Sequence, residues 1–372
     1  MQGLKNLPQH ATPDFVAKRT WAKSKQVMPR IGLVGLGFMA ATHLKAFREV
    51  DGAEIVALCN PSGNRLDGDF SDVAGNVGDN EPIKLEPGSF KGFTSYKEML
   101  LDPEIDAIDI CSPTFAHREH AVLALNAGKH VLCEKPLARN VRDAKQILDA
   151  AEKSGKIMMP AMCLRFWPEW AWLKKTIDEG SYGKVLSASF RRVAEAPAWG
   201  QQNFLDGPRS GGALFDLHIH DTDFVQFCFG RPSAVQSTGY TKVSGAIDHV
   251  VTQYHVNCGA MVFAEGAWSF AKGFGFNMAY TVNFENATVE YDLSRGDECL
   301  RVCEAGKEPE HRKIDGPDGY VGELRHFVES IQNGTQPSVV TSKCACTSVE
   351  ICEAEELSVS NGPSAVGQLV FL

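Results

Sequence analysis

The stretch that most constrains the fold runs from Arg30 to Asn60. The apolar run 31–34 predicts a buried parallel strand, the turn Gly-Leu-Gly-Phe-Met-Ala at 35–40 opens a helical pattern, and 54–59 predicts a second strand. A strand, a glycine turn, a helix and a strand follow one another within about 30 residues. In this context a G-x-G-x-x-A sequence indicates dinucleotide binding.

Each residue of the turn has an expected role. Gly35 allows a tight bend, Gly37 lets the backbone approach a pyrophosphate, and Ala40 lets the helix lie close to the strand. Phe38 and Met39 begin the helix, whose free N–H groups and positive dipole end attract phosphate. An ordinary tight turn without a ligand is the alternative. The flanking strands favour cofactor binding by Gly35, Gly37, Phe38 and Met39.

Length and charge limit the other possibilities. With 372 residues the chain is long enough for two domains. A net charge of −9 argues against a nucleic-acid partner, because there is no basic surplus to neutralise phosphates. No apolar run approaches the roughly 18 residues that span a bilayer, so no membrane association is expected. We expect an N-terminal extension at 1–28, without the apolar core of a signal sequence.

The eleven cysteines are an odd number and form no Cys-x-x-Cys framework. Buried, reduced thiols explain them most simply and predict a cytoplasmic protein. The pair Cys344 and Cys346 could bind a metal or form a redox pair. It lies in a helical pattern without a further ligand nearby, so no metal site is predicted.

The residue that closes the second strand decides between NAD and NADP, because an acidic side chain there accepts the ribose hydroxyls and repels a 2′-phosphate. Here the position holds neutral Asn60, followed by Ser62 and Arg65. Arg65 offers a planar cation suited to phosphate, so these three residues are expected to bind the cofactor with a preference for NADP. The alternative is that Arg65 points to solvent.

The strand pattern resumes after a surface loop predicted at 67–90. A strand at 106–111 ends in Ser112, Pro113 and Thr114, and a helix at 117–127 leads to a strand at 130–133. That strand delivers Glu134-Lys135-Pro136. In an open parallel sheet, ligands bind beyond the carboxyl ends of the strands. These segments and the glycine turn should therefore line one crevice.

The chain resembles the Gfo/Idh/MocA oxidoreductases, which include glucose–fructose oxidoreductases and inositol dehydrogenases. The resemblance rests on the glycine turn with His43 behind it, on the segment from Ser112 to His117, and on Gly-Lys-His-Val-Leu-Cys-Glu-Lys-Pro at 128–136. It implies that Lys135 reaches both the nicotinamide ribose and the substrate. It also implies that Glu134 faces the nicotinamide and that the bond before the proline is cis.

Taken with this resemblance, the expected cofactor-binding residues of the later strand ends are Ser112, Pro113, Thr114, His117, Glu134, Lys135 and Arg165. Arg165 belongs to a segment, 165–170, that resembles the family's Arg-Phe-x-Pro sequence at the domain crossover.

The second half alternates with period two. Strands are predicted at 185–193, 234–242, 248–257, 261–270, 277–286, 288–292 and 300–305. They indicate a large, mainly antiparallel sheet. The fold class is therefore α/β: a Rossmann domain at 29–160 with a doubly wound parallel sheet, and an α+β domain at 161–372 for substrate binding and oligomerisation. The resemblance implies that such sheets pack face to face in a homodimer or homotetramer.

A second group of polar residues lies in the helical pattern that follows Gly211 and Gly212. Asp216 and His220 are four residues apart and share one face, whereas His218 points away. The spacing matches the family's D-x-x-x-H pair, which implies that Asp216 and His220 are catalytic together with Lys135. The alternatives are a metal site that includes His218, which the helical pattern disfavours, and a structural role for His220.

These residues fit the oxidation of an alcohol, in which the cofactor takes a hydride and the protein accepts a proton. We expect His220 to be the general base and Lys135 to bind the reacting oxygen, with a sugar, a polyol or a derivative as substrate. A glycosidase that oxidises its sugar transiently, or a regulator that binds cofactor without turnover, remains open. Specificity is expected in loops around Trp199, Asn203 and Arg209.

Overall fold

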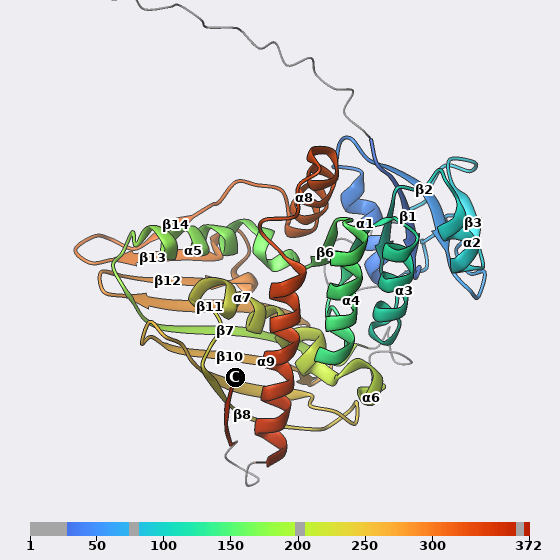
Figure 1. Ribbon diagram of the computed structural model, residues 1–372. Coiled ribbons are helices and arrows are strands. Elements are labelled where there is room, and N and C mark those ends of the chain that lie inside the picture. The colour runs from blue at the N-terminus through green and yellow to red at the C-terminus, as the bar shows by residue number, and fades with distance from the viewer. Residues whose placement is uncertain (1–27, 74–81, 198–204, 362–367) are drawn as a thin grey trace, which may run out of the picture.

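The computed structural model describes residues 28–73, 82–197, 205–361 and 368–372. Most of the expected N-terminal extension, part of the predicted 67–90 loop, Trp199 and Asn203 lie outside these residues. The described chain forms two sheets side by side, each with its own helices (Figure 1).

The first sheet is parallel and has the order β3-β2-β1-β4-β5-β6. Its strands are β1 (Arg30–Val34), β2 (Glu54–Cys59), β3 (Lys91–Phe93), β4 (Ala107–Ile110), β5 (His130–Glu134) and β6 (Met158–Ala161). Its helices are α1 (Phe38–Phe47), α2 (Tyr96–Leu101), α3 (Thr114–Asn126) and α4 (Val141–Ser154). The central strands are buried on both faces, which explains why they read as continuous apolar runs. The predicted doubly wound sheet is confirmed.

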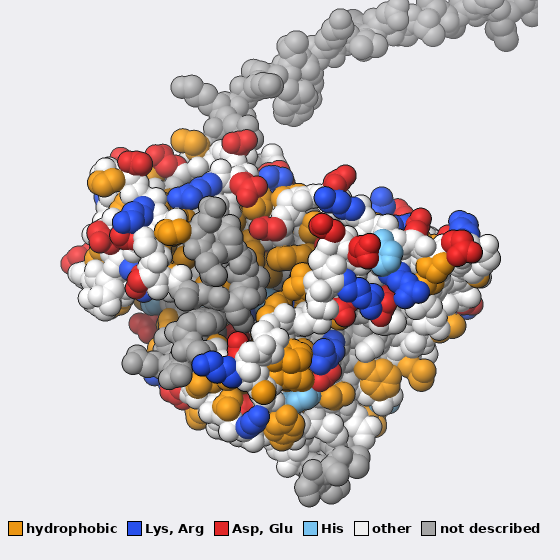
Figure 2. Space-filling model, turned by 180° about the vertical axis from the view of Figure 1, so that it is seen from behind, with side chains coloured by type: hydrophobic (Ala, Val, Ile, Leu, Met, Phe, Trp, Pro, Cys, Tyr) orange, Lys and Arg blue, Asp and Glu red, His pale blue; other side chains and the backbone are white. Residues whose placement is uncertain are grey.

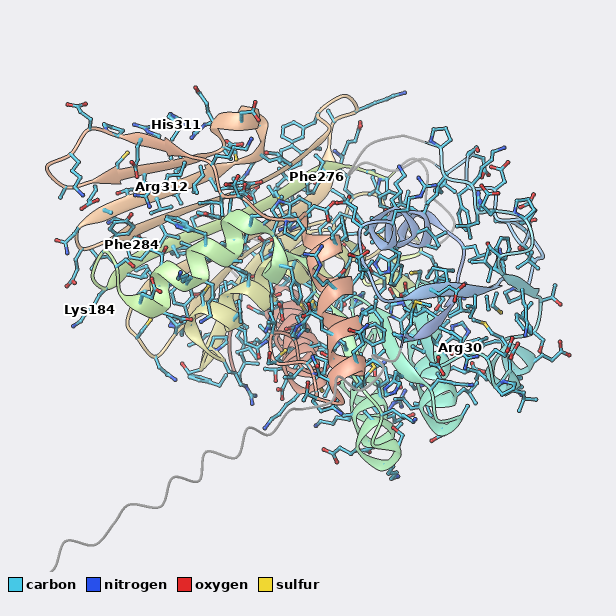
Figure 3. All side chains as sticks on the ribbon, turned by 90° about the horizontal axis from the view of Figure 1, so that it is seen from above. Arg30, Lys184, Phe276, Phe284, His311 and Arg312 are labelled. Carbon is cyan, nitrogen blue, oxygen red and sulfur yellow. The ribbon has the colours of Figure 1, made fainter. Side chains whose placement is uncertain are left out.

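The second sheet has nine strands in the order β14-β13-β12-β11-β7-β10-β9-β8-β15. They are β7 (Val185–Glu195), β8 (Ala234–Tyr240), β9 (His249–His255), β10 (Met261–Phe270), β11 (Phe276–Phe284), β12 (Ala287–Asp292), β13 (Leu300–Glu304), β14 (Glu310–Arg312) and β15 (Leu369–Phe371). Its pairs are antiparallel except β7 with β10, so the prediction of a mainly antiparallel sheet is confirmed. Seen from above, Phe276 and Phe284 of this sheet lie well apart from Arg30 of the first (Figure 3).

The helices of the second half are short, except for two near the C-terminus. They are η1 (Cys163–Phe166), α5 (Pro168–Glu179), α6 (Gly207–Ser210), the π-helical turn η2 (Leu214–His218), α7 (Ile219–Phe229), η3 (Leu293–Glu298), α8 (Gly319–Asn333) and α9 (Ser342–Asn361). Helix α8 returns to the first half and packs on α1, where Gln332 donates to the carbonyl oxygen of Gly52. Helix α9 packs on α4 and on β8, so it contacts both halves.

The buried apolar side chains form two large clusters, and the first of them extends into the second half through Phe215 and Val250. One core surrounds the first sheet and takes in residues of α8 and α9, including Leu324 and Phe327. The other surrounds Trp170, which is fully buried against Phe224 and Tyr280 on one face of the second sheet. Basic and acidic side chains are intermixed on the surface seen in Figure 2. No described helix is long and apolar enough to cross a membrane.

Candidate active site

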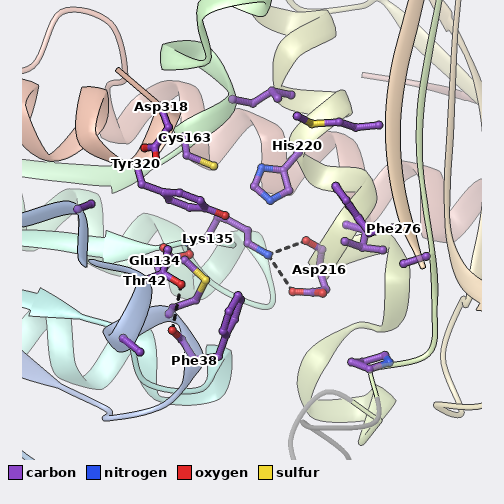
Figure 4. Close-up of a pocket in the computed structure, with 18 of the residues that line it drawn as sticks. Phe38, Thr42, Glu134, Lys135, Cys163, Asp216, His220, Phe276, Asp318 and Tyr320 are labelled. Atoms are coloured by element: carbon purple, nitrogen blue, oxygen red, sulfur yellow. Dashed lines mark hydrogen bonds and ion pairs between the residues drawn. The ribbon is translucent and has the colours of Figure 1, made fainter. Parts of the chain in front are cut away.

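A pocket of about 540 Å³ lies between the two halves and is lined by both. The first half contributes Phe38, Met39, Glu134 and Lys135, and the second contributes Asp216 and His220. Figure 4 shows the Lys135 ammonium pointing at Asp216, with His220, Cys163 and Tyr320 around it. The three residues expected to be catalytic therefore share one pocket, although 85 positions separate Lys135 from His220 in the chain.

Lys135 follows the last residue of β5 and crosses to the second half. Its Nζ donates to Oδ1 of Asp216 at 2.8 Å and to the carbonyl oxygen of the same residue at 2.7 Å. Burial acts to lower the pKa of Lys135, but the nearby charges of Asp216 and Glu134 outweigh it and raise the pKa. Lys135 is therefore a cation at neutral pH, suited to donate to a substrate oxygen.

Asp216 belongs to the π-helical turn η2, and His220 lies in the first turn of α7 directly after it. A regular α-helix was predicted here; the wider turn still leaves both side chains on the pocket. His220 is 9% exposed, and its Nδ1 has no hydrogen-bond partner among the described residues. Burial, together with the cations Lys135 and Arg192, lowers its pKa well below 6.5. The neutral imidazole can thus accept a proton.

His218 points away from the pocket, as predicted. Its Nε2 lies 3.1 Å from the hydroxyl of Tyr254 and 3.5 Å from Oε2 of Glu355, all fully enclosed. Among the described residues, the groups of side chains close enough to hold a metal ion centre on His43, not on His218 or His220. The alternative of a metal site at the two later histidines therefore gains no support from the geometry.

Glu134 lies against His43 of α1. Its Oε1 lies 3.0 Å from His43 Nε2, while Nδ1 of the same ring lies 2.8 Å from Oδ2 of Asp109. Burial raises the pKa of Glu134, but His43 and Lys135 outweigh it and lower the pKa, so the carboxylate is charged. The charged carboxylate lines the pocket, and its Oε2 accepts a hydrogen bond from the backbone N–H of Lys135 at 3.0 Å.

His117 lies behind the pocket, away from its wall. Its Nδ1 is 2.8 Å from the carbonyl oxygen of Pro136, and its Nε2 is 2.7 Å from that of Ser112. It thus ties the end of β4 to the end of β5. The peptide bond between Lys135 and Pro136 is cis, as the resemblance implies. Ser112, Pro113 and Thr114 lie at the end of β4 and the start of α3, beside the glycine turn rather than on the pocket wall.

The glycine turn fits a pyrophosphate. Gly35 has φ +88°, and a Cβ there would lie 2.4 Å from Cα of Ser112, so a larger residue would push the strands apart. Gly37 is the N-cap of α1, has open space beside it and leaves the first turn without a side-chain cap or an acidic residue. The positive dipole end of α1 is therefore not neutralised by an acidic side chain, which favours an anion there.

The residues expected around the ribose are engaged with their own loop. The Asn60 side chain bonds to Ser62 and Asn64. Arg65 forms a bidentate ion pair with Asp72.

Arg209, from the loops where substrate specificity was expected, stacks its guanidinium 3.6 Å from the ring centre of Phe115, where α6 meets α3.

The structure does not bring Arg165 to the pocket. Its Nε and Nη2 each donate to Asp223 at 2.7 Å, and its Nη1 donates to the carbonyl oxygen of Val339 at 2.8 Å. This buried guanidinium, with each nitrogen hydrogen-bonded, links η1 to α7 and to the segment before α9. The physical reason is that a neighbouring helix supplies a carboxylate, which the sequence around Arg165 gives no means of foreseeing.

Several residues of the pocket were not identified from sequence, Arg192 and Tyr320 among them. Arg192 of β7 is buried, donates through Nε to Asp221 at 2.9 Å and lines the pocket. Arg192 and Phe190 are two residues apart in an alternating strand, so both side chains face inward. This pattern could have been noticed in the sequence, because an arginine on the inward face of a strand is unusual. Tyr320 reaches the pocket from the start of α8, and no local pattern indicates such a long-range contact.

Two family profiles match the chain in order. The first, an oxidoreductase family with an NAD-binding Rossmann fold, matches residues 29–162, and the second, the GFO/IDH/MocA C-terminal domain, matches residues 170–290. The chain belongs to the GFO/IDH/MocA oxidoreductase family. The resemblance stated from the sequence is thereby confirmed.

Relatives within this family act on polyols and sugars. Myo-inositol 2-dehydrogenase of Thermotoga maritima is 26% identical over 83% of this chain and 90% of its own length. The NAD-dependent scyllo-inositol 2-dehydrogenase of Bacillus subtilis is 27% identical over 90% of this chain and 94% of its own. A levoglucosan dehydrogenase, solved in complex with NADH and levoglucosan, has a TM-score of 0.78 at 22% identity, covering 92% of this chain and 99% of its own. This last likeness establishes the fold.

Proposed function

We propose that this chain transfers a hydride between a nicotinamide cofactor and a hydroxyl or carbonyl carbon of a sugar, a polyol or a related compound. The proposal is carried by one observation: the ammonium of Lys135 and the neutral imidazole of His220 come from different halves and line the same pocket. Family membership, and relatives named as inositol and levoglucosan dehydrogenases, support the substrate class.

When bound, the nicotinamide would supply the hydride acceptor or donor; the glycine turn at α1 would hold its pyrophosphate. His220 takes the proton from the substrate hydroxyl, because its lowered pKa keeps a nitrogen free. Lys135 donates to the same oxygen and stabilises negative charge that develops on it. Asp216 fixes the ammonium and contacts the adjacent sugar region. In ketone reduction the steps run in reverse: protonated His220 gives its proton to the oxygen, and Lys135 donates a hydrogen bond to the same atom.

The experiment is an absorbance assay at 340 nm with NAD⁺ and NADP⁺ against a panel of inositols, anhydrosugars, aldoses and glucosides. Net formation of reduced cofactor with at least one of them supports the proposal. A second assay with nitrophenyl glycosides distinguishes a glycosidase, which releases nitrophenol without net formation of reduced cofactor. A protein that binds the cofactor but turns over nothing in either assay would be a regulator and would contradict the proposal.

A homodimer or homotetramer through the second sheet belongs to the same proposal. The sheet face opposite α7 and α9 carries Tyr240, Val251 and Met261, which are 50%, 40% and 59% exposed. Their register places them on one surface, together with polar neighbours. Light scattering coupled to size exclusion tests this, and a monomer at micromolar concentration would contradict it.

We also propose that the Rossmann domain ends at residue 160, directly before the end of β6, as expected from the sequence. A reducing, cytoplasmic location of the protein belongs to the same proposal. The eleven cysteines all lie within the described residues and all are free thiols, which supports a reducing compartment. NADP was preferred from the sequence around Asn60 and Arg65, and this stays a prediction. The pairing of Arg65 with Asp72 instead favours NAD(H).

A further inference from the structure

The loop after β2 is where a Rossmann fold reads the adenosine ribose. Asn60 occupies the deciding position, but its side chain is held by its own loop. Its Nδ2 donates to the carbonyl oxygen of Asn64 at 3.0 Å, and its Oδ1 accepts from the backbone N–H and the hydroxyl of Ser62 at 3.3 and 3.1 Å. Recognition of the ribose therefore depends on other residues nearby.

Arg65 contacts the glycine turn directly. Its Nη1 donates to the carbonyl oxygen of Leu36, the middle residue of that turn, at 3.0 Å. Its Nε and Nη2 donate to the two carboxylate oxygens of Asp72 at 2.9 and 2.6 Å. All three nitrogens are thus engaged. The bidentate geometry is the one in which a guanidinium and a carboxylate bind most specifically, so a phosphate would have to displace Asp72.

The charge around this arginine is negative overall. Asp67, Asp69 and Asp72 line the same shallow recess as Arg65, and Lys84 is paired with Asp69 at 2.7 Å. A 2′-phosphate entering this recess would meet carboxylates at short range, which costs free energy. A ribose diol would instead find carboxylate oxygens that accept its hydroxyl hydrogens.

We propose that Asp72 determines cofactor specificity: it neutralises Arg65 and excludes the 2′-phosphate, so that NAD(H) is preferred over NADP(H). The inference rests on the nicotinamide-cofactor function proposed above. Asp72 lies twelve residues beyond Asn60, the position at which an acidic residue usually makes this choice. A distal carboxylate therefore takes over the role from within an inserted loop.

The test measures the dissociation constants of NADH and NADPH by fluorescence titration of the full chain, without any sugar present. We expect the native protein to bind NADH at least tenfold more tightly than NADPH. In Asp72→Asn, NADPH should bind at least tenfold more tightly than in the native protein, while NADH changes less than threefold. A native preference for NADPH, or an Asp72→Asn variant with an unchanged ratio, would overturn the inference.

Two variants identify the cause. Asp67→Asn removes a carboxylate from the same recess without touching Arg65, and should change the ratio less than threefold. Combining Arg65→Ala with Asp72→Asn should abolish the gain in NADPH affinity, because the gain requires the released guanidinium; a gain that persists would refute the release of Arg65. Asp72 is exposed, so folding should be retained, and thermal melting checks this. If neither coenzyme binds to any variant, the proposed function itself fails.

Discussion

Lys135 and Asp216 join the two halves of the molecule at the pocket, with the ammonium 2.8 Å from the carboxylate and 2.7 Å from the carbonyl oxygen of the same residue. The pair is largely shielded, with side chains 12% and 17% exposed. Because its pKa is raised, Lys135 is a proton donor at neutral pH and not a base. In the proposed reaction, acceptance of the substrate proton therefore falls to His220, whose pKa is shifted the other way.

Replacing Lys135 with methionine should lower kcat by roughly 10²–10⁴-fold, because it removes both the hydrogen bond to the reacting oxygen and the cation that stabilises negative charge. NADH binding should persist within a few-fold. Steady-state kinetics and fluorescence titration measure the two effects. Lys153→Met, at an exposed position of α4, is the matched control. Turnover of Lys135→Met close to that of the control would refute the role.

Asp216→Asn should move the alkaline limit of activity to lower pH. The carboxylate raises the pKa of Lys135 against the effect of burial, so its removal lets burial favour the neutral amine and lowers that pKa. The rate loss on raising the pH should then begin about 1–3 pH units earlier. The measurement is kcat/KM between pH 6 and 10. An alkaline limb that coincides with that of the native enzyme would exclude this coupling.

The fall of kcat/KM in acidic solution should reflect the protonation of His220. Its pKa is lowered by burial and by the cations Lys135 and Arg192, so the base stays neutral as the pH falls through 6.5. We expect kcat/KM for oxidation to stay constant from pH 8 to below 6.5 and to fall only in more acidic solution. His220→Asn should lower kcat by roughly 10²–10⁴-fold. The exposed His311→Gln serves as control; a native profile already halved near pH 6.5 would contradict the lowered pKa.

Much of this site follows from local sequence. Strand β1, the turn at Gly35 and helix α1 are neighbours in the chain, so their pattern predicts their geometry. Parallel strands end at a common edge, which also predicts that Glu134 and Lys135 lie near that turn. The spacing of Asp216 and His220 predicts a shared face, and this holds because a π-helical turn changes their relative direction only moderately.

The parts of the site that the sequence did not predict depend on interactions between residues far apart in the chain. The sequence predicts Arg165 as a cofactor ligand, but in the structure its guanidinium forms two hydrogen bonds to Asp223 on a later helix. Arg65 likewise looks available for phosphate, because nothing local indicates that Asp72 folds back on it. An ion pair depends on the three-dimensional placement of both members. A sequence pattern, which reports one element at a time, cannot supply that placement.

The buried acid Glu323 of α8 gives a prediction about stability. It is fully enclosed, neither oxygen has a hydrogen-bond partner among the described residues, and Oε1 lies 3.8 Å from Nε2 of His43. Burial, together with the carboxylates Glu134 and Asp109, raises its pKa well above 4.5, although His43 opposes this. A folded-state pKa above the unfolded one contributes stability at low pH, and this contribution is lost as the pH rises from about 4.5 toward the folded value.

Glu323→Gln keeps the shape of the side chain but does not titrate, so it escapes that loss. The Tm difference between the variant and the native protein should therefore be more positive at pH 8 than at pH 5, by at least about 2 °C. Differential scanning calorimetry at the two pH values measures it, and the contributions of groups that do not interact with residue 323 cancel in the difference. Glu329→Gln, at an exposed position on the same helix, is the matched control for the loss of a charge. If Glu323→Gln behaves like Glu329→Gln, the buried carboxyl does not hold its proton in the folded state.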